Sequence, residues 1–166
     1  MPRQLIVFLL FAYSYVSAQE KTQKEVYAAM VYNIVKYVQW PNEGQLTEFT
    51  IGVLGDDQVY DLMSKVYGSK TKGAAKIVIK KLAGTDDIAT CQAVFISESK
   101  SSAVASVTKD KPILIISNGK DLTKKGGHVN FIVVDGKLRF ELNPANLETA
   151  GLKSSSALLS IAIIVK

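Results

Sequence analysis

The sequence is poor in the side chains that most often hold metals. Its 166 residues include one histidine, His128, and one cysteine, Cys91. A zinc site would need to be built largely from carboxylates, because neither residue stands at ligand spacing from another. A single cysteine cannot form a disulfide within the chain, so Cys91 is expected to be a buried apolar side chain. We therefore predict no metal site and no cofactor.

Nucleotide-binding loops and nucleophile motifs are also missing. The stretch "GSKTKGAAK" has glycines at phosphate-loop spacing, but Ala74 and Ala75 stand where lysine and serine or threonine would bind phosphate and magnesium. The stretch "GVLGDD" lacks the three-glycine dinucleotide pattern. His128 could serve Ser155 or Ser156 as a base, but no nucleophile motif surrounds either serine. These absences predict a protein that is not an enzyme.

Arginine is scarce as well, with Arg3 and Arg139 the only two. Arg3, the apolar run Leu5–Phe11 and small residues ending at Ala18 have the pattern of a cleaved secretory signal peptide. The run is shorter than the roughly 20 residues that span a bilayer. We predict a signal peptide at residues 1–18, cleavage after Ala18, and one exported domain at residues 19–166.

Loss of Arg3 lowers the formal charge from +5 to +4. An exported protein with almost no arginine is not expected to bind nucleic acid. The lysines gather in two groups, at residues 65–81 and 120–125. Such groups fit either an anionic surface or, as we favour, solvated loops and protected strand edges.

Apolar residues make up 48% of the chain and alternate between helical and extended patterns without a repeat. Asp135-Gly136 between two β-rich runs is a strong hairpin signal. Further helices are expected within residues 56–68, 101–109, 143–151 and 154–165, and buried strands between them. This order predicts a single α/β domain: a mixed β-sheet with helices on both faces and an antiparallel C-terminal hairpin, a Rossmann-like three-layer arrangement.

The helix that precedes Pro41 has two ridges. Its core stripe is expected to contain Tyr27, Met30, Val31, Ile34 and Val38. A second ridge beside the stripe mixes amide, ammonium, phenol and indole groups, in Asn33, Lys36, Tyr37 and Trp40. This ridge either anchors the helix end or belongs to a binding surface.

Polar residues also interrupt the predicted hairpin. Pairing outward from Asp135-Gly136 places Asn130, Arg139 and Glu141 on one face and two phenylalanines on the other. Arg139 and Glu141 either form an ion pair that stabilises the hairpin or contribute to a pocket or contact surface.

Five stretches, in order, resemble the YfiR/HmsC-like family of exported bacterial proteins: "AAMVYNIVKYVQWP", "IGVLG", "CQAVFIS", "GGHVNFIVVDGKLRFELN" and "AGLKSSSALLSIA". The resemblance runs from about Val26 to Ala162. It includes the helix signature and the hairpin, with these matching candidate residues: Asn33, Lys36, Trp40, Asn130, Arg139 and Glu141. Unlike YfiR-like proteins that carry several cysteines, this chain has only Cys91, which could still join two chains.

The resemblance implies a periplasmic regulator without catalytic activity. Its partner would be an inner-membrane diguanylate cyclase, with effects on cyclic-di-GMP and biofilm formation, or a sensor histidine kinase. The six candidate residues are expected to form one site if Trp40 covers the hairpin face that bears Arg139 and Glu141, with Asn33 or Lys36 satisfying loop carbonyls. A homodimer remains open. So does a periplasmic sensor or carrier, in which the arginine, carboxylate and indole would bind a zwitterion or a phosphate.

Overall fold

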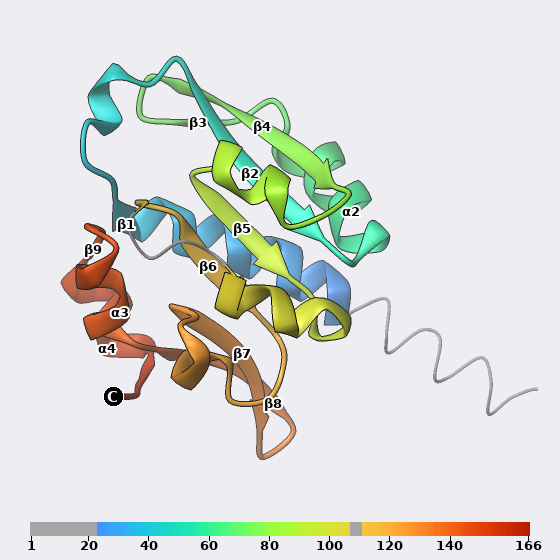
Figure 1. The fold of residues 1–166 in the computed structure, drawn as a ribbon, viewed down its shortest axis with the longest axis vertical. Helices are drawn as coiled ribbons and strands as arrows, with labels where there is room; N and C mark the ends of the chain where they lie inside the picture. The colour runs from blue at the N-terminus through green and yellow to red at the C-terminus, as the bar shows by residue number, and fades with distance from the viewer. Residues whose placement is uncertain (1–22, 107–110) are drawn as a thin grey trace, which may run out of the picture.

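The computed structural model describes residues 23–106 and 111–166, which form an α/β fold around a mixed sheet (Figure 1). The sheet has the strand order β10-β8-β7-β6-β5-β2-β4-β3, and β1 and β9 form a separate two-stranded sheet. A helix at residues 23–37 precedes β1. The strands are β1 Val38–Gln39, β2 Glu48–Leu54, β3 Thr71–Lys72, β4 Ala75–Leu82, β5 Ala93–Ile96, β6 Leu114–Ser117, β7 Val129–Val134, β8 Lys137–Leu142, β9 Lys153–Ser154 and β10 Ile163–Ile164. The α-helices after the N-terminal helix are α2 Asp57–Tyr67, α3 Pro144–Thr149 and α4 Ser156–Ile161.

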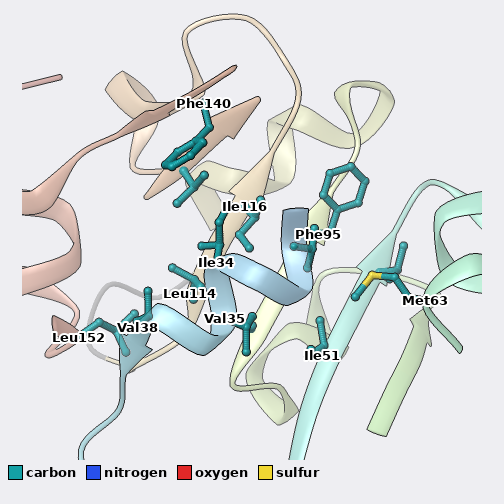
Figure 2. Close-up of a cluster of buried hydrophobic side chains, with 14 of the residues drawn as sticks. Ile34, Val35, Val38, Ile51, Met63, Phe95, Leu114, Ile116, Phe140 and Leu152 are labelled. Atoms are coloured by element: carbon teal, nitrogen blue, oxygen red, sulfur yellow. The ribbon is translucent and has the colours of Figure 1, made fainter. Parts of the chain in front are cut away.

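Five neighbouring strands, β4, β2, β5, β6 and β7, run parallel. Their side chains alternate between two apolar layers because successive residues of a strand point to opposite faces. The larger layer lies against the N-terminal helix, α2 and the C-terminal segment. Figure 2 shows Ile34 and Val35 of the N-terminal helix among Ile51, Leu114 and other side chains of the sheet.

The opposite face is covered by 3-10 helices at Asp86–Thr90 (η2), Glu98–Ser106 (η3) and Leu122–Lys125 (η4). The predicted three-layer α/β fold is therefore confirmed. The helix expected at residues 101–109 is, over its described part, the end of the 3-10 helix Glu98–Ser106, whose backbone departs from helical angles at Lys100. The last helix is also shorter than expected, because it ends at Ile161 and the chain then extends into β10.

The hairpin has the predicted register. Asp135 and Gly136 both have positive φ, 50° and 70°, as a two-residue turn of the twisted hairpin type requires. Asn130 faces Glu141, and Ile132 faces Arg139. Phe131 stacks on Tyr27 of the N-terminal helix at 5.2 Å between ring centroids, so this face belongs to the core as expected.

The N-terminal helix ends at residue 37, three residues earlier than Trp40, and the chain continues as β1. β1 pairs antiparallel with β9, with Val38 facing Ser154, and Ser155 donates its backbone N–H to the carbonyl of Tyr37 at 2.9 Å. The two ends of the domain are thereby joined. Within the described ranges, no helix has the length and hydropathy to cross a membrane.

Candidate functional site

The polar face of the hairpin contains a hydrogen-bonded network. Asn130 is 1% exposed, and its side chain accepts from Ser117 Oγ at 3.2 Å and donates to Glu141 Oε2 at 3.3 Å. The same Glu141 oxygen accepts from Thr123 Oγ1, also at 3.3 Å. The short η4 segment therefore lies over the start of β7 and the end of β8. This network satisfies the buried Asn130 amide, which would otherwise be costly to bury.

Asn143 and Asn146 fix the position of η4. The side chain of Asn143 caps α3 by accepting from the backbone of Asn146 at 3.1 Å. Asn146 Nδ2 donates to the carbonyls of Thr123 and Gly127, each at 2.9 Å. Pro144 follows as the first residue of α3, the position where its missing N–H has no cost. Asn143 is therefore the cap of this helix and Pro144 its first residue, and Asn143 and Asn146 also hold the loop that covers Glu141.

Arg139 lies outside this network, on the same face of β8 but two residues closer to the hairpin turn than Glu141. Its side chain is exposed, and no ion pair joins it to Glu141 among the described residues. The interpretation of the two as an ion pair is therefore wrong. Glu141 is directed to Thr123 and Asn130 because η4 covers only the inner end of the hairpin.

The ridge of the N-terminal helix divides into exposed and buried parts. Asn33 and Lys36 are exposed, and the Lys36 ammonium lies 5.0 Å from the centre of the Tyr32 ring. Trp40 is 6% exposed, donates Nε1–H to the carbonyl of Gln92 at 3.0 Å, and packs edge-on against Phe49. Trp40 therefore anchors the chain after the helix, which was one of the two interpretations of the ridge.

The structure does not join the ridge and the hairpin cluster into one site. Trp40 belongs to the core layer that contains Phe131 and Phe140. Asn130 and Glu141 point to the opposite face, because they alternate with those phenylalanines along β7 and β8. The predicted cover of Arg139 and Glu141 by Trp40 is therefore wrong. Of the six candidate residues, all of which the structure describes, only Asn130 and Glu141 are hydrogen-bonded to each other.

Sequence reasoning missed Lys72, whose ammonium binds a backbone carbonyl just after the N-terminal helix. Lys72 is 7% exposed and donates to the carbonyl of Val38 at 2.9 Å. It also forms an ion pair with Glu43 at 3.0 Å and lies 5.0 Å from the centre of the Trp40 ring. Glu43 in turn accepts from the backbone N–H of Trp40 at 3.1 Å. The expectation that Asn33 or Lys36 would donate a hydrogen bond to such a backbone carbonyl is wrong. No local pattern around Lys72 distinguishes it from the exposed lysines nearby.

His128 is a buried structural residue. The imidazole Nδ1 accepts a hydrogen bond from the backbone N–H of Ile115 at 2.8 Å, and the backbone N–H of His128 donates to the carbonyl of Ile115 at 3.1 Å. Burial lowers the pKa of His128 to about 4, despite a smaller opposing effect of the Asn146 backbone. The imidazole is therefore neutral near pH 7, with its proton on the other nitrogen. His128 therefore continues the hydrogen bonding between β6 and β7 by one residue, with its imidazole in place of a backbone carbonyl.

Cys91 is also buried, at 3% exposed, and burial raises the pKa of its thiol. This confirms its expected role as a core side chain. Within the described ranges, no group of three or more histidine, cysteine or acidic side chains is placed to hold a metal ion. A hollow of about 450 Å³ lies beside α3 and β9, and it is lined by none of the six candidate residues.

Comparison with known proteins gives one family. The sequence model of the family described as YfiR/HmsC-like matches residues 24–163. The matched region begins in the N-terminal helix and ends at the first residue of β10, so it covers the described fold except for residue 23 and residues 164–166. None of the curated proteins compared with the chain matches it.

Proposed function

This chain belongs to the YfiR/HmsC-like family, and on that premise we propose that it represses an inner-membrane diguanylate cyclase or sensor histidine kinase by binding that protein's periplasmic region. The family is known for periplasmic regulators of cyclic-di-GMP signalling. The observation that carries the proposal is the match itself, which spans the fold from the N-terminal helix to β10.

The distribution of polar groups supports binding rather than catalysis. The exposed candidates Asn33, Lys36 and Arg139 are free of the structural networks that occupy Asn130, Glu141 and Trp40. Exposed side chains at the helix ridge and hairpin offer polar contacts to a macromolecule. His128 is neutral, buried and used as a backbone acceptor, which is a poor arrangement for a general base that must reach a substrate.

Export is part of the proposal. Residues 1–18, the predicted signal peptide, lie outside the described residues. Mass spectrometry of protein recovered from the periplasmic fraction of its host is expected to give an N-terminus at Gln19. An intact Met1 on protein found only in the cytoplasm would contradict both export and the proposed partner.

Repression is tested by gene deletion and complementation in the host. Deletion is expected to raise cyclic-di-GMP or the output of the kinase, and the wild-type gene to restore repression. Asn33→Ala, Lys36→Ala and Arg139→Ala are expected to restore it incompletely. Their free energies of unfolding should remain within about 0.5 kcal/mol of wild type, as for ordinary surface changes. Normal signalling after deletion would refute the proposed function.

A further inference from the structure

The outer edge of β8 is only partly used by the sheet. β10 pairs with β8 at Glu141 and Leu142 alone. In the described part of the chain, no strand pairs with residues 137–139 on the side away from β7. Figure 1 shows the β7–β8 hairpin projecting at one end of the molecule, beyond the C-terminal segment.

Along β8, the backbone groups of successive residues point alternately toward β7 and toward the open side of the sheet. The carbonyl of Leu142 accepts from the backbone N–H of Val165 on the β10 side. The backbone N–H of Asn143 donates to the carbonyl of His128 on the β7 side. Because the direction alternates along a strand, Leu138 directs both its N–H and its C=O away from β7, and Phe140 leaves its N–H open there while the parallel register of β10 uses its carbonyl. These groups form a short template on which a further strand can pair.

The side chains on this edge carry uncompensated positive charge. Lys137 and Arg139 are exposed and share a face, and neither has an ion pair among the described residues. The other face of the hairpin is apolar, with half-buried Leu138 and with Val133, which is 58% exposed.

The opposite margin of the sheet differs. β3 covers β4 only at Ala75 and Lys76. Beyond them, Lys80 pairs with Asp87 at 3.5 Å and Lys81 with Asp57 at 2.7 Å. Two cations of the β4 margin, Lys80 and Lys81, are thus paired within the chain, whereas Lys137 and Arg139 of the β8 margin are available to another molecule.

A second copy of the chain is a poor occupant of the β8 edge. Since β10 blocks the edge beyond Phe140, antiparallel self-pairing must place Arg139 opposite either Arg139 or Lys137 of the other copy. Like charges directly opposite each other destabilise a strand pair, whereas opposite charges stabilise it. Charge complementarity therefore favours a strand with acidic side chains.

We infer that the edge formed by Lys137–Phe140 binds an extended segment of the membrane partner in which acidic and apolar residues alternate. This inference rests on the proposed function and specifies how the partner is recognised. The segment adds a strand to the sheet, and its backbone pairs with both backbone groups of Leu138 and with the N–H of Phe140. Its acidic residues face Lys137 and Arg139, and its apolar residues cover Leu138.

The test uses the purified mature protein and two capped eight-residue peptides, one alternating glutamate with valine and one alternating lysine with valine. The glutamate peptide is expected to bind about tenfold more tightly, since two favourable charge pairs replace two repulsive ones. It should also slow amide hydrogen exchange at Leu138 and Phe140. Lys137→Glu/Arg139→Glu should reverse the preference, and the control Lys70→Glu/Lys76→Glu, on the other sheet margin, should not.

Equal binding of the two peptides, no binding of either, or slowed exchange along β4 instead would overturn the inference. A dimer of the free protein that Leu138→Pro dissociates would assign the edge to a second copy and would also overturn it. In the host, the failure of the two proposals is distinguishable. If deletion raises signalling but the folded Lys137→Glu/Arg139→Glu variant represses normally, only the edge inference fails. If deletion has no effect, the proposed function fails whatever the peptides do.

Discussion

The buried neutral His128 should make the stability of the domain depend on pH in a defined range. Its pKa is about 4 in the folded protein, against 6.5 for the ordinary side chain. Between these values the unfolded chain binds a proton that the folded protein does not. The free energy of unfolding therefore falls as pH falls from about 6.5 to about 4, and the contribution is fully present above 6.5. This difference in pKa corresponds to about 3 kcal/mol.

The matched variant is His128→Asn, because the asparagine side-chain oxygen can accept the hydrogen bond from Ile115 without taking up a proton. Urea unfolding at several pH values between 7 and 4, followed by the fluorescence of the single tryptophan, Trp40, gives the free energy for both proteins. Carboxylates titrate in both, so the difference between wild type and variant isolates His128. We expect this difference to change by about 3 kcal/mol across the range.

An NMR titration of the imidazole supplies the second measurement. A folded-state pKa near 6.5 would refute the reasoning. So would an equal pH dependence of wild type and His128→Asn, since it would assign the whole effect to other groups.

Further predictions compare substitutions at buried, bonded residues with substitutions at exposed ones. Lys72→Ala should lower the free energy of unfolding by about 3 kcal/mol in urea melts, because it leaves the Val38 carbonyl and the Glu43 carboxylate without their cation. Lys36→Ala is the exposed control. An equal loss of stability in both variants would contradict the burial argument. Glu141→Ala should cost about 1–3 kcal/mol by leaving the Asn130 amide without its acceptor. Arg139→Ala should change thermal stability little, and a large loss would indicate the ion pair that the structure lacks.

Several local features were predictable because the signals for them lie within a few residues. Asp135-Gly136 requires two positive φ angles, and it sets the whole β7–β8 register. Asn143-Pro144 sets the start of α3 in the same way. The face of the hairpin on which Asn130 and Glu141 lie then follows from the alternation of strand side chains.

The placement of the candidate residues relative to one another was not predictable. Two residues on one strand face can be assigned from spacing, but whether a third residue covers them depends on which layer each element joins. Trp40 and Glu141 are both near a loop in sequence, yet the sheet separates them. Likewise η4 brings Thr123 to Glu141 across 18 positions of the chain.

The sequence by itself determined the α/β alternation, the hairpin and its register, the apolar faces, and the lack of a sequence motif for metal or nucleotide binding. These follow from short-range periodicity, turn geometry and residue type. Only the tertiary structure decided that Lys72 rather than Lys36 reaches the Val38 carbonyl, that Glu141 binds Thr123 rather than Arg139, and that the β8 edge remains open. The physical reason is that such contacts join residues distant in sequence, and their partners are selected by the packing of whole layers.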